Sequence, residues 1–96
     1  MPRTYCVYIM SSRSGVLYIG VTGNLERRVR QHRNGHNDGF TKRYRCTALV
    51  YFEEFQYVEA ALAREKQVKT WARQKKMKLI LTLNPAWKDL AGEVGE

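Results

Sequence analysis

The chain has 96 residues, 44% of them apolar and 27% charged, which leaves room for one folded domain with a modest core and excludes an intrinsically disordered chain. Seventeen Lys and Arg against nine Asp and Glu give a formal net charge of +8 and a pI near 9.8. Such an excess fits a well-solvated surface or a polyanionic partner, because Lys and Arg release condensed counterions when they neutralise phosphates.

The cysteine content and the hydropathy of the chain indicate the cellular compartment in which the protein is expected. Cys6 and Cys46 are forty residues apart, with no CxxC pair and no nearby histidine cluster, so neither a zinc site nor a disulfide-rich secreted fold is expected. No stretch approaches the roughly 18 apolar residues of a membrane span, and no signal-peptide pattern opens the chain. We therefore expect a cytoplasmic protein that does not enter a membrane.

The first elements form a β-hairpin in this prediction. Residues 5–10 are a short apolar run of β-forming side chains, typical of a strand buried on both faces. A turn cluster follows at 11–15, and residues 16–21 give a second strand.

The register of this hairpin decides how two tyrosines meet. If Met10 pairs with Val16 across the turn, Tyr8 lies directly opposite Tyr18. Directly opposed residues share a face of the sheet and nearly touch. We therefore expect the two phenols side by side.

A basic helix and a basic loop come next. The helix runs from about Leu25 to Arg33, with Thr22 or Asn24 as its cap and Asn34-Gly35 at its end. The following loop carries the cluster Lys42-Arg43-Tyr44-Arg45.

The second half adds a strand and helical segments. Residues 48–52 form the third strand, residues 58 to about 76 have a helical pattern, and an apolar segment from 77 to 83 ends at Asn84-Pro85. Residues 87–90 are expected to pack back on the core.

These elements predict one α+β domain over residues 1–90, with a three-stranded, mainly antiparallel sheet flanked by helices. Residues 91–96 are expected to form a flexible C-terminal tail.

One carboxylate interrupts the apolar stripe of the long helix. The stripe is formed by residues at three- and four-residue spacing, namely Val58, Ala61, Leu62, Val68 and Ala72. Glu65 falls in the middle, where an ionised carboxylate is costly unless it is paired or binds a cation. A structural ion pair with an arginine and a hard-metal ligand both remain open, since carboxylate oxygens suit Mg²⁺ or Mn²⁺.

The motifs of the first half resemble the GIY-YIG nuclease family, which is named after two strand segments. Here these segments read Cys6-Val7-Tyr8 and Tyr18-Ile19-Gly20; the second matches fully and the first keeps the tyrosine. The family continues with a capped helix carrying an arginine and, one turn later, a histidine or tyrosine. Arg28 and His32 fit that pattern and share one helix face.

The resemblance extends from about Thr4 to Leu90 and includes the misplaced carboxylate. The family's metal-binding glutamate lies in a context like Ala63-Arg64-Glu65-Lys66, so the resemblance implies Glu65 as the ligand of one Mg²⁺ or Mn²⁺. Asn84 is the candidate for a family asparagine near the end of the domain. The five residues Tyr8, Tyr18, Arg28, His32 and Glu65, in this order along the chain, are a more specific signal than either tripeptide alone. The pattern is most similar to small stand-alone members.

The resemblance implies a metal-dependent endonuclease. One of Tyr8 and Tyr18 would accept the proton of the attacking water while the other orients it, and the assignment stays open. Nearby positive charge makes a phenolate accessible, although a free phenol is a poor base at neutral pH. Arg28 would hold the phosphate, and His32 would relay a proton or contact phosphate.

Further basic residues predict a phosphate-binding surface, on which Tyr44 or Trp71 could stack against a base, although Trp71 equally fits the core. Phosphate contacts carry no sequence information, so we expect low specificity or structure-guided cleavage of duplex or branched DNA, or of RNA. The residues assigned to nucleic-acid binding are Arg27, Lys42, Arg43, Arg45, Lys69 and Arg73.

Two alternatives remain. A catalytically weak nucleic-acid-binding module predicts salt-sensitive binding that is indifferent to metal, but it has no need of Glu65 on an apolar stripe. A DNA-repair adaptor predicts no direct nucleic-acid binding, which the net charge of +8 disfavours.

Overall fold

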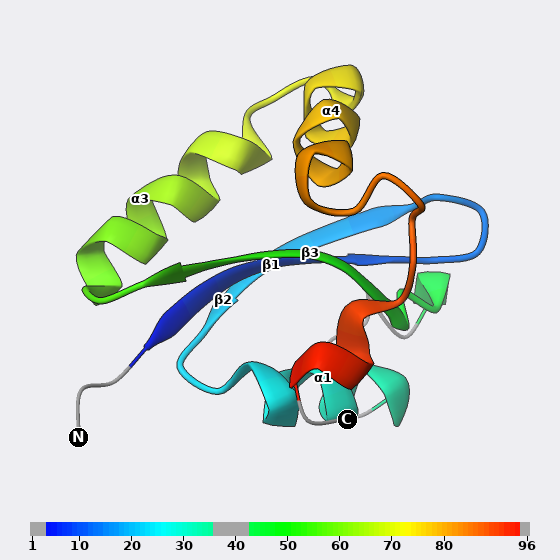
Figure 1. Ribbon diagram of the computed structural model, residues 1–96, viewed down its shortest axis with the longest axis horizontal. Coiled ribbons are helices and arrows are strands. Elements are labelled where there is room, and N and C mark those ends of the chain that lie inside the picture. Colours follow the sequence, from blue (N-terminus) through cyan, green and yellow to red (C-terminus); the bar gives the residue numbers. More distant parts are fainter. Residues whose placement is uncertain (1–3, 36–42, 95–96) are drawn as a thin grey trace.

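The protein is a sheet covered by helices on both faces (Figure 1). The computed structural model describes residues 4–35 and 43–94. In chain order its elements are β1 (Tyr5–Ser11), β2 (Leu17–Thr22), α1 (Leu25–Arg33), β3 (Ala48–Phe55), α3 (Val58–Lys69), α4 (Arg73–Leu83) and the 3-10 helix η1 (Leu90–Val94).

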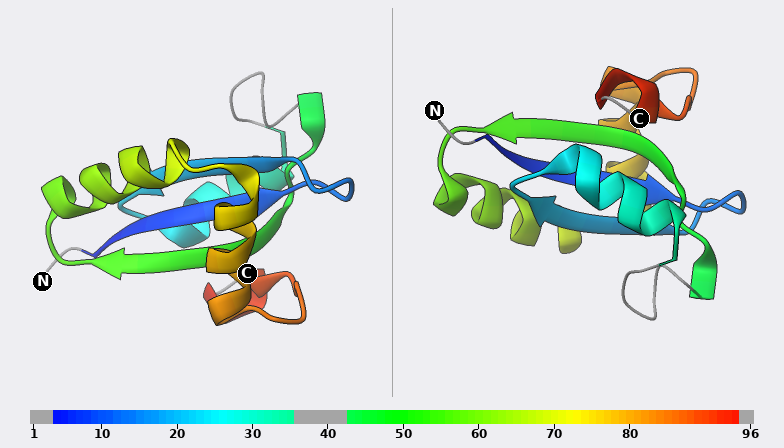
Figure 2. Two further views of the ribbon diagram at one scale, coloured as in Figure 1. Left: turned by 90° about the horizontal axis from the view of Figure 1, so that it is seen from above. Right: turned by 90° about the horizontal axis from the view of Figure 1, so that it is seen from below.

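The sheet has the order β2-β1-β3, and β1 pairs antiparallel with both neighbours. Helix α1 and η1 lie on one face, whereas α3 and α4 lie on the other (Figures 1 and 2). The predicted α+β architecture is therefore confirmed, with a sheet that is antiparallel throughout. No helix within residues 4–35 and 43–94 is long and apolar enough to cross a membrane.

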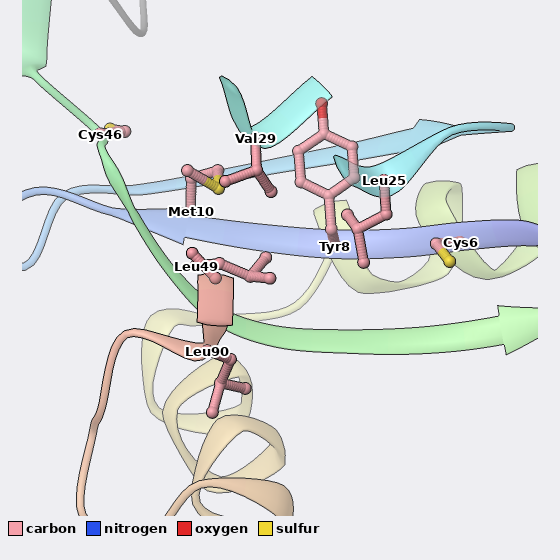
Figure 3. Close-up of a cluster of buried hydrophobic side chains, with 9 residues drawn as sticks. Cys6, Tyr8, Met10, Leu25, Val29, Cys46, Leu49 and Leu90 are labelled. Atoms are coloured by element: carbon pink, nitrogen blue, oxygen red, sulfur yellow. The ribbon is translucent and has the colours of Figure 1, made fainter. Parts of the chain in front are cut away.

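Two apolar clusters lie against the two faces of β1. On one face, Tyr8 and Met10 pack with Leu25 and Val29 of α1 and with other buried side chains (Figure 3). On the opposite face, Val7 and Ile9 belong to a cluster that includes residues of α3 and α4. Alternating side chains of one strand thus enter both clusters, which is why its sequence is continuously apolar.

The hairpin register differs from the predicted one. Tyr8 pairs with Gly20 and Met10 pairs with Tyr18, so the expected direct pairing of the two tyrosines is wrong. The loop still has five residues, but it lies one residue further along the chain, at 12–16, where the amide of Val16 donates to Ser12 Oγ at 2.9 Å and Val16 stays outside the ladder. A slip of two residues keeps every side chain on its face. The two tyrosines therefore still share a face, as diagonal neighbours.

The long helix predicted from 58 to 76 is in fact two helices. Helix α3 ends at Lys69, where Thr70 donates its hydroxyl to the carbonyl of Gln67 at 2.7 Å and Ala72 adopts an extended backbone. A threonine that bonds to a nearby backbone carbonyl competes with helix continuation. Ala72 is consequently exposed and does not belong to the apolar stripe, while α4 starts afresh at Arg73.

The C-terminal segment is packed where a loose tail was predicted. Residues 90–94 form η1, and Ala91 is only 2% exposed. Asp89 fixes this segment, since its Oδ1 accepts from the amides of Leu49 and Ala91 and its Oδ2 binds Arg33 of α1 at 2.5 Å. The domain therefore includes the described residues past position 90.

Candidate active site

Three of the predicted site residues lie in contact on the α1 face of the sheet. Tyr8 is fully buried, and its Oη lies 3.1 Å from Nε2 of His32, in hydrogen-bonding distance. The ring of Tyr18 lies 6.3 Å from that of Tyr8 and 5.1 Å from that of His32, between ring centroids. Two adjacent strands and one helix thus build a cluster of two phenols and an imidazole.

Local sequence explains why α1 presents His32 to this cluster. Asn24 caps the helix, its side chain accepting from the amide of Arg27 at 3.0 Å. Leu25 and Val29 then face the core, and His32 follows on the same buried stripe one turn later. The cap and the apolar residues therefore fix the rotation of the helix, and with it the histidine.

Arg28 lines a pocket at the start of the same helix. The pocket has a volume of about 280 Å³ and polar walls formed by Thr22, Gly23, Asn24, Arg27, Arg28 and Gln31. Arg28 is half-buried, whereas Arg27 is exposed. Two guanidinium groups beside the amino end of a helix favour an anion at this position.

Glu65 lies on α3, on the face of the sheet opposite the cluster of Tyr8, Tyr18 and His32. Its side chain is 16% exposed and its Oε2 lies 3.2 Å from Nζ of Lys69, so the ion pair weighed from the sequence exists, with a lysine in place of an arginine. Helix α3 packs on the face opposite α1. No group of three or more His, Cys, Asp or Glu suited to a metal exists within the ranges that the structure describes.

The rotation of α3 directs Glu65 toward the edge strand β2. The buried Ala61 and Val68 face the sheet. At about 100° per residue, Arg64 then projects about 50° to one side of that direction and Glu65 about 50° to the other. Arg64 bonds to Glu53 of β3, so Glu65 lies on the side of β2, the strand that carries Tyr18.

A network that the sequence analysis missed holds α3 to β3. Arg64 donates from Nε and Nη2 to the two carboxylate oxygens of Glu53, both at 2.9 Å, and Tyr51 donates to the same carboxylate at 2.5 Å. Burial raises the pKa of the Glu53 carboxyl, but the hydrogen bonds from Arg64 and Tyr51 and the charge of Arg64 outweigh it, so the net shift is downward. The only sequence signal was the two-residue spacing that places Tyr51 and Glu53 on one face.

Asn84 has a role in the fold. It follows α4, is buried, and its amide donates to the carbonyls of Val50 at 3.1 Å and Lys88 at 2.7 Å. Its Oδ1 accepts from the amide of Lys88 at 2.8 Å. These bonds connect β3 with the chain after α4, so the structure gives Asn84 a bracing function.

The predicted nucleic-acid-binding residues are spread over the surface. Arg27, Arg43, Arg45, Lys69 and Arg73 are exposed, and Lys42 lies outside the described residues. Arg43 lies 5.6 Å from the ring centroid of the exposed Tyr44. The described members of the set are therefore accessible from solvent, and their role in nucleic-acid binding stays a prediction.

Trp71 packs partly into the core, which agrees with the prediction that it belongs to the core and does not stack on a base. Lys75 Nζ lies 4.3 Å and the guanidinium carbon of Arg64 5.1 Å from its ring centroid. Such contacts are cation–π interactions. These contacts hold the Trp71 ring within the fold. The exposed Tyr44 is therefore the better candidate for stacking on a nucleic-acid base.

The fold and the tyrosine cluster define the class of protein. The model of the GIY-YIG catalytic domain matches residues 4–78, and the chain belongs to the GIY-YIG family. It is 43% identical to a UPF0213 protein of Staphylococcus saprophyticus over 77% of this chain and 90% of the relative. A UPF0213 protein of Staphylococcus aureus is 39% identical over 80% of this chain and 94% of the relative.

A solved structure shares the fold. The solution NMR structure of a UPF0213 protein from Bacillus halodurans superposes with a TM-score of 0.59 at 28% sequence identity, covering 90% of this chain and 92% of that chain. The chain is therefore similar to UPF0213 proteins over most of its length.

Proposed function

We propose that the protein is a metal-dependent endonuclease that hydrolyses phosphodiester bonds of DNA with low sequence specificity or guided by DNA structure. One observation carries this proposal: the contact of Tyr8 with His32 at 3.1 Å, with the ring of Tyr18 beside both, in a chain of the GIY-YIG family with a net charge of +8.

The residues present fit one Mg²⁺ or Mn²⁺ with few protein ligands. Mg²⁺ typically keeps several waters and takes one or two carboxylates together with substrate phosphate. Glu65 supplies one such carboxylate, and its partner Lys69 is half exposed and free to swing into solvent. The metal would act as a Lewis acid and lower the pKa of a bound water. The buried thiols fit such an ion poorly, since burial and the charge of Glu54 raise the pKa of Cys6 to about 11.

Tyr8 and Tyr18 differ in solvent exposure, which suggests different roles in catalysis. Tyr18 is partly exposed, and in its phenolate form it would accept a proton from a water at the surface and become the neutral phenol. Tyr8 is fully buried and bonded to His32, so it orients the pair. Arg28 holds the phosphate in the polar pocket and opposes the negative charge of the transition state.

The exposed Arg27, Arg43, Arg45, Lys69 and Arg73, together with Lys42, would bind the phosphate backbone of duplex or branched DNA, or of RNA. We further propose the cytoplasm as the compartment, because Cys6 and Cys46 are both free thiols. DNA repair is proposed as a setting only because a nuclease guided by DNA structure would act there.

The deciding experiment compares wild type with Glu65→Gln on supercoiled plasmid and branched DNA, with Mg²⁺, Mn²⁺ or EDTA. We expect cleavage that requires metal and is lost in the variant, while DNA binding in EDTA is retained. Equal binding without cleavage by either protein would favour a catalytically weak nucleic-acid-binding module. Absence of binding by a folded wild type would favour a DNA-repair adaptor.

A further inference from the structure

The bridge between α3 and β3 lies one residue from the proposed metal ligand. Glu53 and Arg64 are one-fifth and one-quarter exposed, and they meet through two hydrogen bonds of 2.9 Å. A bidentate arginine–carboxylate pair fixes orientation as well as distance. It therefore sets both the position and the rotation of α3 at residue 64.

Further contacts hold the guanidinium of Arg64 in place. Its Nη1 donates to Gln67 at 2.8 Å, and the group lies 5.1 Å from the ring centroid of Trp71, in the connection to α4. Tyr51 holds the partner carboxylate from the strand. A lysine at position 64 would keep the charge but lose the two-pronged contact.

Resting on the proposed function, we propose that Arg64, Glu53 and Tyr51 form a positioning clamp that holds Glu65 on the β2 side of α3, in the orientation that binds the divalent metal. The clamp acts through helix geometry: Arg64 and Glu65 lie about 100° apart around the axis, so fixing one fixes the other. Groups that orient a metal ligand typically change metal affinity 10- to 100-fold when they are removed.

The chain provides a matched control for loss of stability. Arg33 and Asp89 form a second arginine–carboxylate bridge, between α1 and the C-terminal segment, on the other face of the sheet. Replacing Arg33 by Lys weakens a bridge of the same chemistry far from Glu65 in the fold. A general loss of stability would affect both variants, whereas a positioning role affects only the clamp.

The test is a Mn²⁺ titration of the ¹⁵N-labelled full chain, followed by paramagnetic broadening of backbone amide signals. In wild type we expect broadening centred on Glu65, and none there in Glu65→Gln. Arg64→Lys and Glu53→Gln should weaken Mn²⁺ binding at least about 10-fold. Arg33→Lys should leave it within about twofold. Tyr51→Phe, which removes one hydrogen bond only, is the milder variant if the others unfold.

The outcomes separate this proposal from the proposed nuclease function. Unchanged Mn²⁺ affinity in folded clamp variants overturns the clamp and leaves the nuclease intact. Equal weakening by Arg33→Lys also overturns it, because the effect would then be one of stability. If broadening at Glu65 depends on the clamp but the protein cuts no DNA, the clamp is supported and the proposed nuclease function is overturned. A wild type without broadening near Glu65 overturns the clamp.

Discussion

The ring of Tyr8 occupies the space above Gly20. A Cβ atom added at Gly20 would lie 2.5 Å from Oη and 2.6 Å from Cζ of Tyr8, closer than carbon atoms approach without displacement. The two residues are also direct partners in the β1–β2 ladder. The glycine therefore permits the buried tyrosine to cross the neighbouring strand and reach His32.

Gly20→Ala should consequently move the Tyr8 ring and break its contact with His32. We expect a loss of about 1–3 kcal/mol in unfolding free energy, as for other overpacked sites, and a loss of DNA cleavage. Gly92→Ala is the control, since a Cβ there meets nothing within 4 Å. Urea unfolding and plasmid cleavage measure the two effects. Equal behaviour of the two variants would contradict the steric role of Gly20.

Replacing each tyrosine by phenylalanine tests their division of labour. Tyr18→Phe should reduce the cleavage rate about 10²- to 10⁴-fold, the usual contribution of a general base. Tyr8→Phe should reduce it less and cost about 1 kcal/mol of stability, because it loses the hydrogen bond to His32. Single-turnover rates over a range of pH distinguish the two. A larger rate loss in Tyr8→Phe would exchange the assigned roles.

Arg27→Ala should weaken DNA binding in a salt-dependent way. Removing one phosphate contact reduces the slope of log affinity against log salt by about 1. Arg30→Ala is the matched control on the same helix, because Arg30 already pairs with Glu26 at 3.0 Å. Fluorescence anisotropy with labelled duplex over a series of salt concentrations gives both slopes. A slope unchanged by Arg27→Ala would exclude this residue from the binding surface.

Asp89 should contribute to stability mainly through the two amides that it satisfies. Asp89→Asn keeps an oxygen acceptor for Leu49 and Ala91 but loses the charged contact with Arg33, a partly exposed pair that contributes about 1 kcal/mol or less. Asp89→Ala also leaves those amides without this acceptor, at a further cost of about 1–3 kcal/mol. Urea denaturation of both variants checks the order, and a reversal would refute it.

The carboxylate of Glu53 should make the free energy of unfolding depend on pH. The folded-state pKa of Glu53 is lowered from its ordinary value of 4.5, so its contribution is fully present above that value and is lost as the pH falls through the lowered pKa. Glu53→Gln should therefore be less stable than wild type at neutral pH, and the difference should shrink in acid. Chemical denaturation at several pH values measures this. A difference that grows on acidification would show the opposite shift.

Local sequence patterns were enough to predict most of the strands and helices, and the family resemblance implied the three site residues that lie in contact. The continuous apolar run of β1 and the capped amphipathic pattern of α1 are local signals, which predicted a strand at Tyr8 and a helix at His32, while the resemblance to the GIY-YIG family implied that both belong to one site. The shared face of the tyrosines also survived an incorrect register, because side chains alternate with a period of two. Glu65 stood out because a carboxylate on an apolar stripe is anomalous.

How these elements pack against one another became visible only in the folded structure. The hydrogen bond of Val16 to Ser12 moved the register by two residues, and the turn at Thr70 divided one predicted helix into α3 and α4. The bridge between Glu53 and Arg64 joins residues eleven positions apart on different elements. Nothing local specifies such a pair, because its energy exists only once β3 and α3 are packed together. Hydrophobic periodicity therefore could not predict on which face of the sheet Glu65 lies.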